Sequence, residues 1–295
     1  MDVERIAVLG AGTMGHGIAQ VAAMAGFRVR MRDVSGEVLA RARDQIAWSL
    51  DNLVRKGRLS REDAAAAQER IAVTTDLREA VAEADLVIEA VPENLDLKLQ
   101  VFAEVDRLAP AHAVLTSNTS QFSITRLAAA TGRPERVCGM HFFNPPVLMK
   151  LVEIARGART SDETHALVAD VSRRMGKETV TCKDSPGFIT TRLIGLLWVE
   201  AMRILEEGVA TAEDIDKACR LGLGHAMGPL ETADWSGLDV AYAISESLRQ
   251  HLGERFQTTA THRNLVYSGA LGRKTGQGIY RYADGGRSGG STGGR

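Results

Sequence analysis

The stretch 6-IAVLGAGTMGHGIAQVAAMAG-26 decides the fold of the first half of the chain. Its start is apolar and predicts a buried strand, and its second half has the apolar spacing of a helix. Between them lies the pattern G-x-G-x-x-G, whose glycines permit a tight turn and a close approach of the backbone to a pyrophosphate. The residues of this turn that we expect to bind a cofactor are Gly10, Gly12, Thr13, Met14 and Gly15.

A carboxylate follows the turn at the spacing that a dinucleotide site needs. Asp33 ends a second predicted strand, residues 28–33, where it can accept hydrogen bonds from ribose hydroxyls. The same charge would repel a 2′-phosphate, which favours NAD over NADP, although Arg30 and Arg32 soften this preference. A glycine turn without a ligand is the alternative, and the register of strand, helix and acid argues against it.

Short β-branched runs alternate with helical patterns over the first two thirds of the chain. This alternation predicts βαβ units, and therefore an α/β fold of the Rossmann type with a doubly wound, mainly parallel sheet. We expect strands at 6–10, 28–33, 84–91, 113–118, 136–143 and 151–155, and helices at 15–26, 36–55, 61–70, 95–108 and 123–131.

The pattern changes near residue 184. Ser185-Pro186 is a good helix start, and the run that follows it, 187–208, is apolar on more than one face, so other helices or a second subunit should cover it. We predict an NAD-binding domain at 1–184 with a helical insertion near 36–70, a smaller all-helical dimerisation and substrate domain at 185–283, and a disordered Gly/Ser-rich tail at 284–295.

The bulk composition excludes several classes of partner. The formal net charge is −1, so electrostatics give no reason to expect nucleic acid or an anionic membrane. No run of apolar residues is long enough to cross a membrane, and the N-terminus lacks the basic segment of a secretory signal. The three cysteines, Cys138, Cys182 and Cys219, are far apart and odd in number, which fits a reducing compartment. We expect a cytoplasmic protein without a metal site.

His141 lies in the stretch 138-CGMHFFNPP-146, near the end of a predicted strand. A lone histidine on a strand is more often structural than catalytic. Three features favour catalysis here: the strand end, where doubly wound folds bind ligands; the polar turn at Asn144-Pro145; and Glu153 on the next apolar strand, which needs a partner if it is buried. A carboxylate beside an imidazole fixes its tautomer and stabilises its protonated form, as a general base requires.

Two further polar groups follow predicted strands. The segment 117-SNTS-120 is either an ordinary loop with hydroxyl caps or a site where a hydroxyl donates to a substrate oxygen. Glu93 follows the apolar run 84–91, and Lys98 comes five residues later. On a helix these two would normally be solvated charges, but at the carboxyl end of a strand they can also line the nicotinamide half of the cofactor.

Taken together, these segments resemble the short-chain L-3-hydroxyacyl-CoA dehydrogenases, including the bacterial 3-hydroxybutyryl-CoA dehydrogenases. The matching segments, in order from residue 10 to about 280, are GAGTMGHGIAQ, VIEAVPEN, SNTS, HFFNPP followed by MKLVEI, KDSPGF, MGPLE, GLD and GRKTGQGIY. The resemblance implies an enzyme that uses NAD to oxidise a (3S)-3-hydroxyacyl-CoA reversibly to the 3-oxoacyl-CoA, with a short-chain substrate such as 3-hydroxybutyryl-CoA. It also implies a role in fatty acid metabolism, for example β-oxidation. The apolar faces of the second domain predict a homodimer.

The resemblance assigns roles to individual residues. It implies that His141 takes the 3-hydroxyl proton, that Glu153 orients His141, and that Ser120 hydrogen-bonds the reacting oxygen beside the nicotinamide. It implies contacts with NAD at Asp33, Glu93, Lys98, Ser120, Asn144 and Lys274. Substrate contacts are implied at Ser49 and Lys56, where the helical insertion would meet coenzyme A, and at Ser120 and Asn144.

Two positions depart from the family pattern. Thr191, in PGFITTR, stands where the family has an asparagine that helps to bind the substrate oxygen. Its hydroxyl can still donate a hydrogen bond but has a shorter reach, so we expect an altered acyl preference or a reduced rate. Gln121 follows Ser120 where a second serine is common, so the loop near the thioester differs.

Three alternative functions stay open. Dehydrogenases of the 3-hydroxyisobutyrate and 6-phosphogluconate type share a similar glycine turn but use a lysine base, and no comparable lysine motif starts the helix at 187–208. A related dehydrogenase of a free hydroxy or sugar acid, such as the gulonate type, is harder to exclude because the coenzyme A contacts are the weakest match. The third is a non-catalytic NAD-binding protein, which Thr191 supports and the set of Ser120, His141 and Glu153 opposes.

Overall fold

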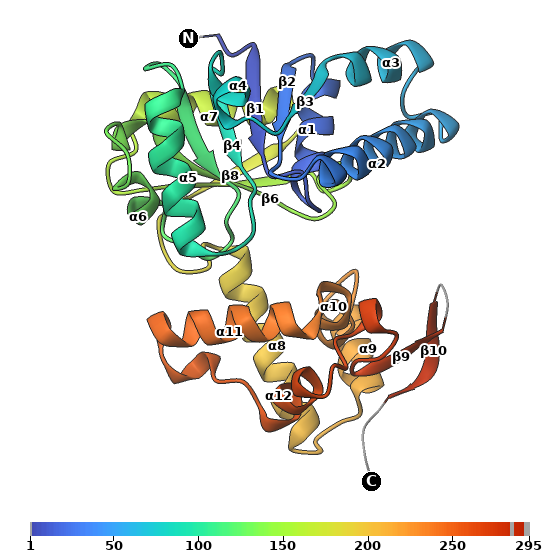
Figure 1. Cartoon of the computed structure of the whole chain (residues 1–295). Helices are drawn as coiled ribbons and strands as arrows, with labels where there is room; N and C mark the ends of the chain where they lie inside the picture. The colour runs from blue at the N-terminus through green and yellow to red at the C-terminus, as the bar shows by residue number, and fades with distance from the viewer. Residues whose placement is uncertain (1, 284–285, 292–295) are drawn as a thin grey trace. The chain divides into compact units, whose positions relative to one another are not determined.

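Figure 1 shows the computed structural model of the chain, which describes residues 2–283 and 286–291. The chain divides into two compact units, Met1–Ser185 and Pro186–Arg295. Each unit has its own apolar core. No helix within the described residues is long and apolar enough to cross a membrane.

The first unit is built on an eight-stranded sheet in the order β3-β2-β1-β4-β5-β6-β7-β8. All neighbouring strands are parallel except β6 and β7, which are antiparallel. The doubly wound, mainly parallel sheet predicted from the sequence is therefore confirmed. The strands are β1 (Arg5–Leu9), β2 (Arg28–Arg32), β3 (Ile71–Thr74), β4 (Leu86–Glu89), β5 (Val114–Ser117), β6 (Val137–Phe142), β7 (Leu151–Arg156) and β8 (Glu178–Lys183).

Helices cover both faces of this sheet (Figure 1). On one face, Ile18 of α1, Leu39 of α2 and Val168 of α7 belong to the main apolar core. On the other face, Phe102 of α5 packs near Leu9 and Leu115. The helices are α1 (Gly15–Met24), α2 (Gly36–Arg55), α3 (Arg61–Glu69), α4 (Leu77–Val81), α5 (Leu95–Leu108), α6 (Ile124–Ala128), the short 3₁₀ helix η1 (Pro134–Arg136) and α7 (Asp162–Arg174).

The strand order reverses between β1 and β4, because the chain leaves β1 toward β2 on one side and returns to β4 on the other. In doubly wound sheets the carboxyl ends of the strands at such a reversal form the ligand crevice. The polar caps that start the nearby helices lie along this edge: Ser35 accepts a hydrogen bond from Val38 N–H at the start of α2, and Asn94 accepts one from Leu97 N–H at the start of α5. The fold thus gathers the loops after β1, β2, β4, β5 and β6 at one edge.

Some elements were not predicted from the sequence. The edge strands β3 and β8 are only partly buried and were not assigned as strands, although β3 reads Ile-Ala-Val-Thr. The amphipathic helix α7 was also missed. Helix α3, by contrast, lies where the sequence predicts a helix, and Ser60 caps it by accepting a hydrogen bond from Asp63 N–H at 2.9 Å.

The second unit is mainly helical, around α8 and α11. Its core contains Trp198 and Met202 of α8, Leu238 of α11, and Tyr280. Its elements are α8 (Thr190–Glu206), α9 (Ala212–Gly222), α10 (Pro229–Ser236), α11 (Leu238–Leu252), α12 (Ala260–Tyr267), the 3₁₀ helices η2 (Glu254–Phe256) and η3 (Arg273–Thr275), and strands β9 (Tyr280–Ala283) and β10 (Gly286–Ser291).

The end of the chain differs from the prediction of an all-helical domain followed by a disordered tail at 284–295. Strand β10 pairs with β9 in an antiparallel hairpin. Pairing of this kind satisfies backbone N–H and C=O groups whatever the side chains are, so the Gly/Ser composition did not reveal it. The rest of the predicted tail, residues 284–285 and 292–295, lies outside the described residues. Helix α8 also begins at Thr190 rather than at Ser185-Pro186, because Gly187 and Phe188 both have positive φ.

Candidate functional site

The glycine turn after β1 has two glycines that the protein itself requires. Gly10 has a φ of 98°, and a Cβ there would overlap the carbonyl oxygen of Ala90. A Cβ on Gly15 would overlap the carbonyl oxygen of Gly10. Close packing of β1, α1 and the loop after β4 therefore accounts for both residues.

Gly12 is different, because a Cβ there would meet no atom of the described protein within 4 Å. Packing therefore gives no reason for a glycine at this position. The amino end of α1 also has no side-chain cap, so its N–H groups and positive partial charge are not engaged by a side chain. An open cradle beside an uncapped helix start fits the pyrophosphate of a dinucleotide.

Asp33 lies beside this cradle and is half-buried. Its Oδ2 accepts a hydrogen bond from Ala11 N–H at 2.9 Å, and its Oδ1 accepts one from Ser35 N–H at 3.2 Å. These contacts hold the carboxylate at the end of β2 and leave lone pairs that can accept ribose hydroxyls. Arg30 donates to the backbone carbonyl of Glu79 in α4, and Arg32 donates to that of Thr75, just after β3. This arrangement fits NAD better than NADP.

His141 and Glu153 are directly opposite each other across the antiparallel β6–β7 pair. His141 Nδ1 lies 2.8 Å from Glu153 Oε2, and the two residues are 6% and 0% exposed. The ring of Phe143 packs against the imidazole with centroids 4.6 Å apart. An ionised Glu153 favours the tautomer with the proton on Nδ1, which puts the lone pair on Nε2.

The segment 117-SNTS-120 is tied to the strand that carries His141. Asn118 Oδ1 accepts a hydrogen bond from Phe142 N–H at 2.8 Å. Ser120, two residues further on, is half-buried, and Asn144 is exposed just past the end of β6. The loop after β5 is thus joined to the end of β6 by a side chain, Asn118, that the sequence did not single out as functional.

Glu93 and Lys98 form an ion pair at the start of α5, at 3.0 Å. Lys98 also pairs with a second carboxylate, because its Nζ lies 2.7 Å from Glu89 Oε1. The side chains of Lys98 and Glu89 are each 1% exposed. Glu93 also accepts hydrogen bonds from Thr119 Oγ1 and from Ser120 N–H. The predicted residues Glu93, Lys98 and Ser120 are therefore brought together in one network.

Glu89 is a member of this network that the sequence interpretation missed. Burial raises the pKa of Glu89 above its ordinary value, although Lys98, Ser117 and the N–H of Val91 each favour the ionised form. A signal was present, because an acid ends the apolar run of β4 just as Glu153 interrupts the apolar run of β7. A buried acid needs a partner in both cases.

Four predicted site residues belong to elements other than those that carry Glu93, Ser120, His141 and Glu153. Ser49 is within α2 and Lys56 is its C-cap. Thr191 and Lys274 belong to the second unit. Thr191 is 6% exposed in the first turn of α8, and Lys274 Nζ lies 2.6 Å and 2.7 Å from the two carboxylate oxygens of Asp239.

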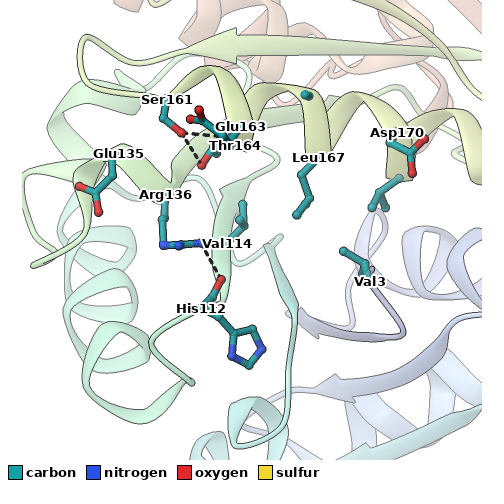
Figure 2. A pocket seen from close by; sticks show the side chains of 12 residues that line it. Val3, His112, Val114, Glu135, Arg136, Ser161, Glu163, Thr164, Leu167 and Asp170 are labelled. Atoms are coloured by element: carbon teal, nitrogen blue, oxygen red, sulfur yellow. Dashed lines mark hydrogen bonds between the residues drawn. The ribbon is translucent and has the colours of Figure 1, made fainter. Parts of the chain in front are cut away.

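A cavity of about 630 Å³ in the first unit does not contain these residues. Figure 2 shows it between α7 and the segments that precede β1, β5 and β6, lined by His112, Arg136 and Ser161 among others. It therefore lies at the amino ends of the parallel strands, opposite to the edge that carries His141. Within the described residues there is no cluster of three or more side chains suited to hold a metal ion.

Comparison with known proteins places the chain among dehydrogenases. The models of the 3-hydroxyacyl-CoA dehydrogenase NAD-binding domain and C-terminal domain match residues 5–185 and 187–282. A probable 3-hydroxybutyryl-CoA dehydrogenase of Deinococcus radiodurans is 44% identical over 94% of this chain and 100% of its own length. A 3-hydroxyadipyl-CoA dehydrogenase of Escherichia coli is 43% identical over 95% of this chain and 59% of its own. The crystal structure of the (S)-3-hydroxybutyryl-CoA dehydrogenase PaaH1 from Ralstonia eutropha is 42% identical, covers 96% of this chain and 100% of its own, and superposes with a TM-score of 0.91.

Proposed function

Because the chain belongs to the 3-hydroxyacyl-CoA dehydrogenase family, we propose that it catalyses the reversible, NAD-dependent oxidation of a (3S)-3-hydroxyacyl-CoA to the 3-oxoacyl-CoA. The matches over residues 5–185 and 187–282 confirm the resemblance inferred from the sequence and make NAD the cofactor. The names of the relatives support a short acyl group such as 3-hydroxybutyryl.

The observation that carries the proposal is the buried pair of His141 and Glu153 at the edge of the sheet. In the oxidation direction, His141 Nε2 accepts the proton of the 3-hydroxyl group. Glu153 holds the ring by its Nδ1 side and stabilises the imidazolium that forms. NAD, when bound, supplies the acceptor for the hydride that leaves C3.

We propose that two hydroxyl groups of the protein donate hydrogen bonds to the reacting oxygen of the substrate. The backbone N–H of Ser120 donates a hydrogen bond to Glu93, which holds this residue in place. A fixed backbone supports the role of the Ser120 hydroxyl as a donor to the reacting oxygen. Thr191 is the second proposed donor, in place of the family's asparagine. Its shorter reach should lower the rate or change the preferred acyl group.

The proposed cofactor contacts follow from the cradle and its neighbours. Gly12 leaves space for the pyrophosphate, and Asp33 accepts the adenosine ribose hydroxyls. The nicotinamide half meets the loops after β4, β5 and β6. The proposed residues are Gly10, Gly12, Thr13, Met14, Gly15, Asp33, Glu93, Lys98, Ser120, Asn144 and Lys274.

We assign the coenzyme A part of the substrate to Ser49 and Lys56 on the α2–α3 pair, with Ser120 and Asn144 nearer the acyl group. Lys56 is exposed at the C-terminal end of α2, where an ammonium group is available to a phosphate. Lys56→Ala should raise the KM for acetoacetyl-CoA and leave the KM for NADH unchanged. An unchanged KM for acetoacetyl-CoA would remove this assignment.

We also propose a cytoplasmic homodimer that associates through the C-terminal domain predicted at 185–283. Large apolar side chains stay exposed on this domain, among them Leu193, Leu221 and Tyr267, and a second copy would cover them. The three cysteines are free thiols, which fits a reducing compartment. Light scattering on the purified protein should give twice the mass of one chain, and fractionation of the source cells should recover it with cytoplasmic markers.

One assay tests the proposed function against its alternatives. Loss of NADH is followed with acetoacetyl-CoA, and the activity on this thioester is compared with that on free acetoacetate and with NAD-dependent oxidation of L-gulonate. We expect turnover of the thioester to exceed both. Preference for a free acid would favour a hydroxy-acid or sugar-acid dehydrogenase, and NADH binding without any turnover would favour a non-catalytic protein. A 3-oxoadipyl-CoA arm measures the acyl preference, because relatives named for the two acyl groups are equally similar to this chain.

A further inference from the structure

Glu89 is the centre of a buried polar cluster at the carboxyl end of β4. Its Oε1 accepts hydrogen bonds from Lys98 Nζ at 2.7 Å and from Val91 N–H at 2.8 Å. Its Oε2 accepts one from Ser117 Oγ at 2.6 Å. Glu89 is 1% exposed, and every one of these partners donates, so the carboxylate acts only as an acceptor.

Lys98 has its three donors directed at acceptors within the protein. They reach Glu89 Oε1, Glu93 Oε2 at 3.0 Å, and the carbonyl oxygen of Val91 at 3.3 Å. An ammonium group has three N–H bonds and no more. Lys98 is therefore engaged on all sides by the loop after β4 and is itself buried.

Glu93 is the exposed end of the cluster, and 33% of its side-chain surface is accessible to solvent. One oxygen is held by Lys98, and the other accepts from Thr119 Oγ1 and Ser120 N–H. A carboxylate has about four lone-pair sites, so Glu93 can still accept a hydroxyl from outside. The cluster thus links a fully buried acid to an acid at the surface beside Ser120.

We propose that Glu89 is a positioning residue for the nicotinamide half of the cofactor, acting through Lys98 to hold Glu93 and the Ser120 loop in place. The proposal rests on the proposed function, because it takes Glu93 to meet NAD. This arrangement refines the cofactor contact proposed above for Lys98, because the buried ammonium group then reaches the cofactor through Glu93. The alternative is a buried ion pair that only stabilises the fold, which would leave cofactor binding by the folded protein unchanged.

A double-mutant cycle between Glu89→Gln and Glu93→Gln separates the two roles. The Kd for NADH is measured by nucleotide fluorescence, and kcat and KM are measured with acetoacetyl-CoA. We expect Glu89→Gln alone to weaken NADH binding by roughly five- to fiftyfold. In the Glu93→Gln background the same change should alter the Kd by less than about twofold, because the link to the cofactor is already cut. An unchanged Kd in the single variant, or equal effects in both backgrounds, would overturn the proposal.

Thr116→Val is the matched control. Thr116 is fully buried on β5 next to Ser117, and its Oγ1 donates to Val87 O at 2.9 Å on β4. It joins the same two strands, but strand alternation places it on the opposite face from Ser117. Thr116→Val should lower the melting temperature and leave the Kd for NADH unchanged. An equal loss of NADH affinity in this control would show that any buried polar change here acts on binding, and would overturn the specific role of Glu89.

Ser117→Ala provides a milder variant if Glu89→Gln does not fold. It removes one hydrogen bond to Glu89 and leaves the ion pair with Lys98 in place. We expect about a two- to fivefold weaker NADH affinity that disappears in the Glu93→Gln background, and additive effects would overturn the proposal. NADH binding decides this cycle without turnover, so a wild-type protein that binds NADH but does not reduce acetoacetyl-CoA would refute the proposed function alone.

Discussion

Two buried ionisable groups at the same edge of the sheet are built for opposite tasks. His141 with Glu153 joins one carboxylate to an imidazole, the side chain whose ordinary titration lies between pH 5 and 8. Glu89 and Glu93 surround Lys98, so its ammonium group is held between two carboxylates. The first group is suited to take up and release a proton, and the second to keep a fixed charge in a fixed place. A buried charge can therefore serve either proton transfer or fixed positioning, and the type of side chain paired with the carboxylate determines which.

The largest expected effect comes from removing the imidazole. His141→Gln keeps a polar side chain of similar size but no group that can take up the proton. The rate of oxidation should fall by about 10²–10⁴-fold, with the Kd for NADH unchanged. Turnover near the wild-type level would remove the assignment of His141 as the base.

A smaller loss should follow from changing the partner of the imidazole. Glu153→Gln can donate to Nδ1 instead of accepting from it, which favours the wrong tautomer and no longer stabilises the imidazolium. We expect a rate on the order of 10²-fold lower per folded molecule, as measured by kcat with acetoacetyl-CoA. Equal activity in the two proteins would mean that Glu153 serves the fold rather than the reaction.

The cofactor cradle gives the next effect in size. Gly12→Ala adds a methyl group where the protein has no atoms, so it should leave the melting temperature unchanged and weaken NADH binding roughly tenfold, about 1.4 kcal/mol. Gly10→Ala is the contrasting variant, because its Cβ overlaps Ala90 and its φ is positive, and it should lower the melting temperature. If Gly12→Ala binds NADH as tightly as the wild type, the pyrophosphate does not approach this turn.

The smallest effect concerns a histidine whose pKa is lowered by burial. Burial lowers the pKa of His262, whose Nε2 lies 2.9 Å from the carbonyl oxygen of Leu238 in the second unit. Below the ordinary pKa of 6.5, the unfolded chain binds more protons at this position than the folded chain, so the free energy of unfolding falls as the pH falls.

His262→Gln keeps a donor to Leu238 and removes this titration. Between pH 7.5 and 5.5, denaturant unfolding should show a smaller loss of stability for the variant than for the wild type, by on the order of 1 kcal/mol. An identical loss of stability in the variant and the wild type would show that His262 does not contribute to the pH dependence of unfolding.

The sequence predicted the fold well where apolar periodicity is strong. The central strands β1, β4, β5 and β6 are fully or nearly fully buried, so their apolar runs were plain. The edge strands β3 and β8 have mixed burial, and the β9–β10 hairpin depends on backbone pairing, so none of these showed a clear pattern. Apolar periodicity in a sequence reflects burial, so half-buried elements are hard to predict from it.

The candidate site shows the same limit in another form. Glu153 was found because a histidine on a neighbouring predicted strand offered it a partner. Glu89 carries a similar signature, but its partners are Lys98, on the following helix, and Ser117, which only the β4–β5 register brings opposite to it. Pairing across a parallel sheet depends on strand order, and the sequence did not establish that order residue by residue.

The most direct test of the central claim is the pH dependence of kcat/KM for oxidation of (3S)-3-hydroxybutyryl-CoA between pH 5 and 9. In the wild type and in Glu89→Gln the rate should fall as the pH falls, because a protonated imidazole cannot accept the hydroxyl proton. In His141→Gln the small remaining rate should lack this fall. The same pH dependence in His141→Gln as in the wild type would contradict the assignment of proton transfer to His141.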